Sequence, residues 1–221
     1  MKIVFAPDSF KNSIRSPEVC NIMLEAFRSE LPDCQYVCLP MADGGEGTVE
    51  AALAAGNGEK QSVEVKDPLG RKIIADFAYF PNEKKAIMEM AAASGLELLK
   101  KEEQNPLLTN TYGTGQLLLA AQKLGAKEII MGIGGSATVD AGTGMLQALG
   151  CRLLDKNGNE LSAGAASLKK LHNIDCNAMK FCSKNCKIVV ASDVKSPLCG
   201  PNGASYLFAK QKGATEKMLP E

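Results

Sequence analysis

The chain has 221 residues, enough for one or two domains, and its 45% hydrophobic and 23% charged residues are typical of a folded globular protein. Its 25 basic residues balance its 25 acidic residues, and no block of lysine and arginine stands out, which argues against nucleic-acid or membrane-surface binding. A small neutral or anionic ligand is favoured.

The apolar stretch at the N-terminus ends at Pro7 and is too short for a signal peptide, and no stretch is long enough to cross a membrane. These features predict a cytoplasmic protein. They also predict that the eight cysteines are reduced thiols, most of them packing residues.

The first part of the chain alternates strand and helix patterns, which predicts a β-α-β-α arrangement. Ser16 and Pro17 have the residue types of a helix N-cap and a first helical position. The expected elements are a strand at 2–6, a helix at 16–31, a strand at 35–39 and a helix at 46–55.

The middle of the chain changes pattern, because three strand-like runs are separated only by turn sequences, and this predicts an antiparallel meander. Alternating strands and helices then return, so the whole chain suggests two interleaved lobes, one parallel α/β and one with a meander. We expect strands at 62–66, 72–80, 85–90, 128–133 and 187–191, and helices at 114–124 and 140–149.

Three loops that mix glycine with polar side chains follow predicted strands, at 6–11, 42–48 and 132–140. In an open parallel sheet, ligands bind beyond the carboxyl ends of the strands. The three loops therefore predict one shared site.

The loop at 132–140 reads GIGGSATVD and predicts an anion site. Glycines at 134 and 135 let backbone amides approach a phosphate or carboxylate, Ser136 and Thr138 add hydroxyl donors, and the positive end of the next helix follows. The alternative is a tight turn whose glycines serve backbone geometry alone.

The loop at 6–11 brings Asp8 and Lys11 to either side of Ser9. An ammonium can neutralise a transferring phosphoryl group, and a carboxylate can hold Mg²⁺ or accept a proton. The alternative is a surface turn with a capping side chain and a solvated lysine.

The loop at 42–48 places Asp43 and Glu46 among glycines, as suits Mg²⁺ or the hydroxyls of a polyol. Alternatively, both acids cap or favour the start of the next helix. After the last strand, Asp193 lies beside Lys195, which suggests a base with a charge clamp, although a simple turn is the competing interpretation.

One further group of ligand-type residues carries a weaker signal. The spacing of these residues matches no common structural zinc pattern, so packing is favoured over metal binding. Since the only histidine lies here, outside the glycine-rich loops, a Ser-His-Asp hydrolase is disfavoured. The group is His172, Cys176, Cys182 and Cys186.

A set of motifs, taken together and in order from residue 2 to residue 215, resembles the bacterial glycerate kinase family of type I. The motifs are APDSFKNS, PMADGGEGT, DPLGR, MEMAAASGL, TNTYGTGQLL, GIGGSATVDAGTGMLQALG, SDVKSPLCGPNGAS and QKGAT.

The resemblance implies an α/β fold of two incomplete, interleaved lobes. Residues 1–60 with 106–150 would form a flavodoxin-like lobe, and 61–105 with 151–221 an inserted mixed-sheet lobe. It further implies ATP-dependent phosphorylation of D-glycerate to 2-phosphoglycerate with Mg²⁺. Family members continue past residue 221, so we expect a fragment. The alternative is a truncated, inactive lobe that binds glycerate or nucleotide, or pairs with a missing segment or a second copy.

The resemblance and the loop chemistry together suggest roles for individual residues. We expect Lys11 to clamp phosphate and Asp193 to act as base or substrate anchor. We expect Asp43 and Glu46 to bind Mg²⁺. The expected substrate- or phosphate-binding residues are Asp8, Ser9, Gly134, Gly135, Ser136 and Thr138.

Overall fold

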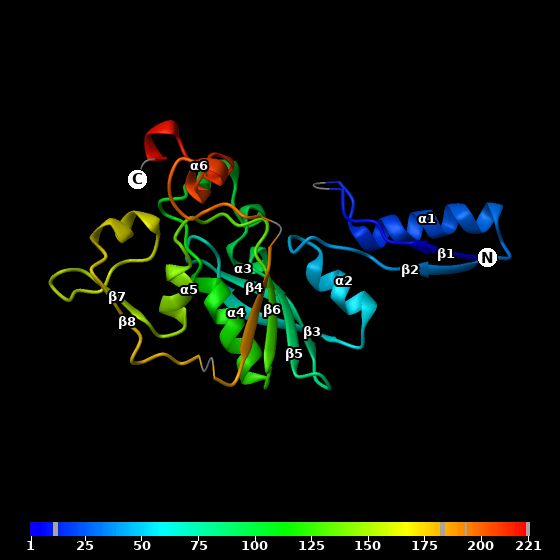
Figure 1. The fold of residues 1–221 in the computed structure, drawn as a ribbon, viewed down its shortest axis with the longest axis horizontal. Helices are drawn as coiled ribbons and strands as arrows, with labels where there is room; N and C mark the ends of the chain where they lie inside the picture. The colour runs from blue at the N-terminus through cyan, green and yellow to red at the C-terminus, as the bar shows by residue number, and fades with distance from the viewer. Residues whose placement is uncertain (11–12, 182–183, 193, 220–221) are drawn as a thin grey trace.

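A five-stranded mixed sheet forms the centre of the protein (Figure 1). The computed structural model describes residues 1–10, 13–181, 184–192 and 194–219. In the strand order β3-β4-β5-β6-β9, β4 runs antiparallel to both neighbours, whereas β6 runs parallel to both of its own. The strands are β3 (Glu59–Lys66), β4 (Lys72–Phe80), β5 (Lys85–Glu89), β6 (Glu128–Gly132) and β9 (Lys187–Ala191).

Helices pack on both faces of this sheet, because side chains along β4 alternate between the faces. Phe77 and Tyr79 enter the main core with Leu117 of α4 (Tyr112–Lys123). Ala78 and Phe80 pack on the other face with Val49 of α2 (Thr48–Ala55). The short helices α3 (Ala91–Ser94) and α5 (Thr143–Ala148) pack beside α4.

The N-terminal β-α-β unit stands to one side of the central sheet (Figure 1). It consists of β1 (Lys2–Phe5), α1 (Ser16–Glu30) and β2 (Gln35–Cys38), and its strands form a separate, parallel two-stranded sheet. The Phe5 ring meets the Phe27 ring of α1 edge-on at 5.2 Å between centroids. On the neighbouring position of β1, Val4 is 50% exposed.

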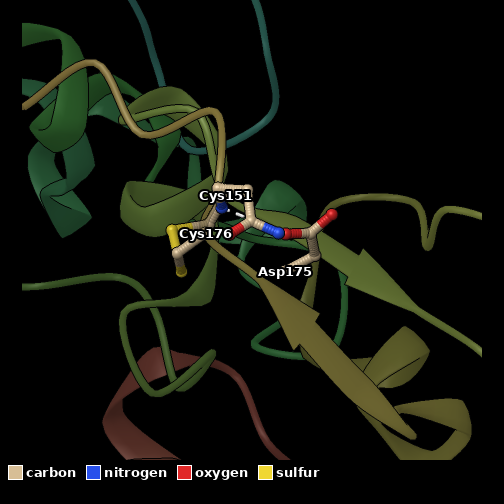
Figure 2. The surroundings of a disulfide bond; sticks show 4 residues. Cys151, Asp175 and Cys176 are labelled. Atoms are coloured by element: carbon tan, nitrogen blue, oxygen red, sulfur yellow. Dashed lines mark hydrogen bonds between the residues drawn. A yellow bond between two sulfur atoms is a disulfide. The ribbon is translucent and has the colours of Figure 1, made fainter.

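A disulfide joins Cys151 to Cys176 (Figure 2). The bond follows from strand register. Arg152 of β7 (Arg152–Leu154) pairs with Asp175 of β8 (Asn173–Asp175) in an antiparallel ladder, so the cysteines at the adjacent positions 151 and 176 face each other. The prediction of reduced thiols is therefore wrong for this pair, whereas the other described cysteines are free.

Short helical segments complete the described residues. They are α6 (Ala204–Phe208) and the 3-10 turns η1 (Leu96–Leu98), η2 (Lys101–Glu103), η3 (Ala165–Lys170), η4 (Lys210–Lys212) and η5 (Glu216–Met218). Among the described residues, no helix combines the length and apolar character needed to cross a membrane.

The predicted α/β class and the meander are confirmed, and the predicted strands form, although β3 begins at Glu59 rather than at 62. The helix expected at 46–55 begins at Thr48 and the helix expected at 114–124 begins at Tyr112, and two other helix starts differ for a local reason. Ser16 is the first helical residue rather than the N-cap, which is Arg15, because the Ser16 hydroxyl donates to the carbonyl of Pro7 instead. The helix expected at 140–149 begins at Thr143, since Gly142 before it has a left-handed φ of 74°.

The strand pairing shows which segments share a sheet. Strand β6 hydrogen-bonds to β5 and β9, and β1 pairs only with β2 among the described strands. The proposed boundaries of the two lobes stay a prediction.

Candidate functional site

The 42–48 loop packs against the carboxyl end of β6. The amide of Gly134 donates to the carbonyl of Gly44 at 3.3 Å, and a Cβ on Gly132 would lie only 2.1 Å from that carbonyl oxygen. A Cβ on Gly44 would lie 3.1 Å from the carbonyl oxygen of Ala191, at the end of β9. Glycine therefore allows this loop to touch the ends of two parallel strands, as the three-loop prediction requires.

The 6–10 segment is tied to the same region through Ser16. The Ser16 hydroxyl donates to the carbonyl of Pro7 at 2.7 Å and accepts from the amide of Met41 at 3.1 Å, so the chain segments that follow β1 and β2 are held together. The carboxylate of Asp8 accepts from the amide of Ser9 at 2.6 Å, a local turn contact.

A cavity of about 520 Å³ lies between residues 9–10 and 13–16, α2 and the face of the sheet beside α2. Ser9 and Glu46 both line it, so two of the predicted loops share one space. Glu89 and Glu97 line it as well, and the ion pair between Arg15 and Glu50 is at its wall.

The carboxyl groups in this cavity are crowded. Burial raises the pKa of Glu89, although its carboxylate accepts the amide of Val49 at 2.8 Å, which favours the charged form. Partial burial also raises the pKa of Glu97, as do a hydrogen bond with Glu46 and the charge of Glu46. A bound cation or ammonium group would relieve this repulsion.

The predicted metal residues fit Mg²⁺ only as part of a larger ligand set. Asp43 accepts the amide of Gly45 at 3.0 Å, and Glu46 faces the cavity. The described residues hold no group of three side chains suited to a metal. Mg²⁺ commonly takes one or two carboxylates with phosphate oxygens and water, so the pair remains chemically suitable.

The 132–140 loop is exposed to solvent at the glycines that are predicted to bind an anion. Gly134 and Gly135 are exposed, and Gly135 has a left-handed φ of 69°. The loop is anchored because the amide of Leu96 donates to Gly135 and the amide of Ala137 donates to Ser94. Within the described part of the chain, the amides of Gly135 and Ser136 donate to no other residue.

The helix after this loop does not offer its N-terminus to a ligand, contrary to the prediction. Asp140 is buried, and its Oδ2 accepts the amide and hydroxyl of Thr111 at 2.9 and 2.8 Å and the amide of Gly144 at 3.0 Å. Its Oδ1 accepts the amide of Gly142 at 3.2 Å. The protein's own carboxylate thus occupies the positive end of α5, and Thr138, within the loop, is buried.

Lys212 is a site residue that sequence reasoning missed. Its ammonium donates to the Ser136 hydroxyl at 2.7 Å and to the carbonyl of Thr138 at 2.8 Å, and the residue is only 7% exposed. Burial lowers the pKa of Lys212 to about 8, and the charge of Asp140 opposes that shift. The QKGAT motif contains this lysine, but no local feature of the motif points to Ser136.

The two predicted catalytic residues, Lys11 and Asp193, lie outside the described residues. Phe10 and Ser192, which precede them, are described; Phe10 lines the cavity.

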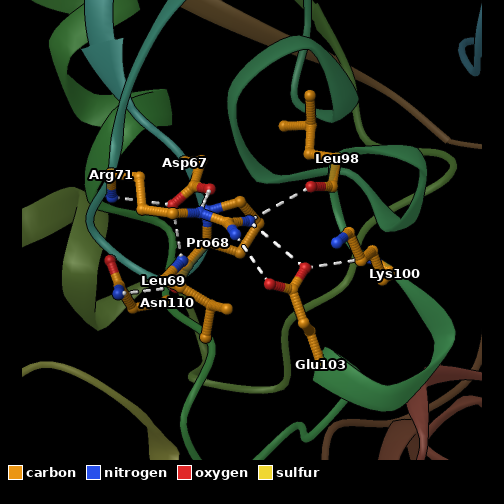
Figure 3. A network of polar contacts seen from close by, with 8 residues as sticks. All are labelled: Asp67, Pro68, Leu69, Arg71, Leu98, Lys100, Glu103 and Asn110. Carbon is orange, nitrogen blue, oxygen red and sulfur yellow. Dashed lines mark hydrogen bonds and ion pairs between the residues drawn. The ribbon is translucent and has the colours of Figure 1, made fainter.

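A polar network holds the 67–71 turn (Figure 3). The buried Asp67 accepts from the amides of Leu69 and Arg71 and from the Arg71 guanidinium, which also contacts Glu103. Asn110 donates to the carbonyl of Pro68 at 2.9 Å. Since Thr111 follows Asn110 and donates to Asp140, this network fixes the segment that supports the 132–140 loop.

The described residues of the group around His172 do not form a zinc site. Cys176 is bonded to Cys151, and Cys182 lies outside the described residues.

The fold and these loops define an α/β protein with its candidate ligand site at the carboxyl ends of parallel strands. The chain belongs to the glycerate kinase family, whose sequence model matches residues 3–221.

Two relatives and one solved structure describe the extent of this match. The chain is 52% identical over 221 residues to the glycerate 2-kinase of Escherichia coli (strain K12), covering 100% of this chain and 58% of that protein. It is 48% identical over 219 residues to the glycerate kinase of Bacillus subtilis (strain 168), covering 99% and 57%.

A crystal structure described as glycerate kinase 2 from Salmonella typhimurium LT2 matches with a TM-score of 0.89 and 47% identity, covering 100% of this chain and 59% of that one. The chain therefore spans about 58% of the length of the curated relatives it matches.

Proposed function

We propose that this chain takes part in the ATP-dependent phosphorylation of D-glycerate to 2-phosphoglycerate. The observation that carries the proposal is a series of contacts that links the three loops, in a chain 52% identical to a glycerate 2-kinase. The carbonyl of Pro7 accepts the amide of Met41, next to the 42–48 loop, and the carbonyl of Gly44 in that loop accepts the amide of Gly134. Phosphoryl transfer depends mainly on positioning and charge stabilisation, and converging loops of this composition suit both tasks.

In the proposed reaction, a hydroxyl oxygen of glycerate bonds to the γ-phosphorus of ATP as the bond to the bridging oxygen of ADP breaks. Asp193 would anchor the substrate or take the hydroxyl proton, and Lys11 would neutralise the transferring group. Gly134, Gly135 and Ser136 would hold phosphate oxygens, because this part of the loop is open to solvent.

Mg²⁺ bound with ATP would neutralise phosphate charge. Asp43 and Glu46 would hold it, and Glu46 is the better placed of the two because it lines the cavity next to Glu97. Asp8 and Ser9 would contact the substrate from the 6–10 segment.

A binding lobe without turnover is the second candidate. It is favoured because the chain spans about 58% of its relatives and leaves two parallel strands partly uncovered. Val4 of β1 and Val190 of β9 are each 50% exposed, although parallel strands are normally covered on both faces. The partner of such a binding lobe would be further polypeptide or a second copy of the chain. For either candidate function, we propose a cytoplasmic location.

The test is a coupled assay of ADP formation by the 221-residue chain with ATP, Mg²⁺ and D-glycerate, with phosphorus NMR of the product. The kinase proposal predicts ADP formation that requires D-glycerate and yields 2-phosphoglycerate. Lys11→Met should slow turnover by orders of magnitude, whereas Lys210→Met, at an exposed lysine ion-paired with Glu216, should leave it unchanged.

Calorimetry with D-glycerate and with ADP separates the two candidates. Ligand binding without ADP formation would select the binding lobe. Turnover of another small hydroxy acid in preference to D-glycerate would overturn the proposed substrate.

A further inference from the structure

Lys212 reaches the 132–140 loop from a distant segment that is firmly held. Gly213, the next residue, has a left-handed φ of 93°, and a Cβ there would lie 2.0 Å from the carbonyl oxygen of Gln104. The backbone therefore passes too close to Gln104 for any residue except glycine. This contact fixes the direction from which the lysine side chain approaches Ser136.

The hydrogen bond to Ser136 sets what that hydroxyl can do. An ammonium group has donors and no acceptor, so the Ser136 oxygen must accept from Lys212. The hydroxyl proton is then left to be donated elsewhere. Ser136 is half-buried beside the exposed Gly134 and Gly135, so an anion at this turn lies within reach of such a donor.

The charge of Lys212 is not cancelled by direct pairing. Asp140 is the acid whose field raises the pKa of Lys212, yet its two oxygens already accept four hydrogen bonds from Thr111, Gly142 and Gly144. The ammonium bonds a hydroxyl and a carbonyl instead. Its positive charge therefore remains available to an anion above the loop, in surroundings where charge is poorly screened.

We propose that Lys212 is the positioning residue of a tetrahedral-oxyanion site, in which its ammonium holds the Ser136 hydroxyl as a donor beside the amides of Gly135 and Ser136. The inference deepens the proposed function, since the oxyanion would be a phosphate group of nucleotide or product. It is nevertheless testable without turnover, through inorganic sulfate.

Sulfate binding distinguishes the proposed role of Lys212 in anion binding from a purely structural role, because the charge of sulfate stays constant in the pH range where Lys212 loses its proton. Burial brings the pKa of Lys212 to about 8, so the ammonium dominates at neutral pH and the amine dominates in mild alkali. A lysine that only supports the backbone at Thr138 would hydrogen-bond both as ammonium and as neutral amine. A lysine in an oxyanion site must carry its positive charge.

The experiment follows the methyl NMR signals of Ala137 and Thr138 in the 221-residue chain during sulfate titration at constant ionic strength. At about pH 7 the signals should shift with saturation, and at about pH 9.5 the affinity should be at least about tenfold weaker. Sulfate that leaves both methyl signals unmoved, or binds equally at the two pH values, would overturn the proposal. The second result would mean an adventitious ion only.

Variants sharpen the same titration. Lys212→Met should bind sulfate weakly at both pH values, and Lys212→Arg should lose no affinity in alkali because guanidinium keeps its charge. The matched control, Lys210→Met in the same 3-10 turn, should follow the unmodified chain. If Lys212→Met fails to fold, the pH dependence of the unmodified chain still decides.

The outcome is independent of the kinase proposal. Sulfate binding that behaves as expected, in a protein that shows no ADP formation, would leave the oxyanion site standing and overturn only the activity. Turnover with pH-independent sulfate binding would do the reverse.

Discussion

The ammonium of Lys212 lies 2.7 Å from the hydroxyl oxygen of Ser136, although 76 positions separate the two residues. The contact joins the last described segment to the loop at the end of β6. The loop that would hold phosphate is thus completed by a residue far from it in the sequence, and the stability of the chain should depend on the protonation of that residue.

The free energy of unfolding should depend on pH through Lys212. Because burial lowers its pKa to about 8, the unfolded chain binds more protons than the folded chain above that pH. Stability from this group therefore rises with pH, by roughly 2 kcal/mol between about pH 7.5 and about pH 9.5. Urea unfolding of the chain and of Lys212→Met measures the difference.

The control for this pH dependence is Lys210→Met, an exposed lysine whose removal should leave the slope unchanged. A chain and a Lys212→Met variant whose stabilities run parallel across this range would show that Lys212 is not held in a desolvated place.

Replacement of Gly132 by alanine should separate the 42–48 loop from β6. The added Cβ would lie 2.1 Å from the backbone oxygen of Gly44, and a backbone atom cannot move aside as a flexible side chain can. We expect a loss of about 3 kcal/mol in unfolding free energy. Gly158→Ala, where no atom lies within 4 Å and only the φ of +80° is unfavourable, should cost about 1 kcal/mol. Equal losses would mean that the loop does not pack on β6 as described.

Asp140→Asn should destabilise the start of α5. Both carboxylate oxygens of Asp140 accept hydrogen bonds, whereas an amide keeps one acceptor and turns an NH₂ group toward donors. In this buried place the loss should be about 3 kcal/mol. Asp155→Asn is the matched comparison, since Asp155 accepts from the amides of Asn157 and Asn159 at the surface and water can replace it there. A loss at Asp140 no greater than at Asp155 would contradict the internal cap.

Reduction should release two thiols from the bond between Cys151 and Cys176. Thiol titration of denatured protein with and without prior reduction counts them, and Cys199→Ser, at an exposed free cysteine, should lower both counts equally. Since the bond closes a sequence separation of 25, its removal should cost about 3 kcal/mol. Identical counts with and without reduction would exclude the disulfide.

The strands and the loop positions could be predicted from sequence because their signals are local. Alternation along β4 distinguishes the face of Phe77 from the face of Phe80, and the glycines of the 42–48 and 132–140 loops mark the points where backbones touch. The apolar run of β9 also predicts a strand, but it cannot reveal that Val190 lies on an exposed edge strand.

The remaining features could not be predicted because they depend on long-range register. The partner of Cys151 follows from the pairing of Arg152 with Asp175, and the role of Asp140 follows from the packing of Thr111 beside α5. A motif that contains Asp140 predicts a helix start, but it cannot say that the helix amides are already occupied.

The central claim is that the three loops form one ligand site, and amide NMR with D-glycerate and a non-hydrolysable ATP analogue tests it most directly. The contacts predict that both ligands shift signals from residues 6–10, 42–48 and 132–138 together, with those of Ser136 among the largest. Shifts confined to one loop, or spread over the face of β7 and β8, would contradict a shared site.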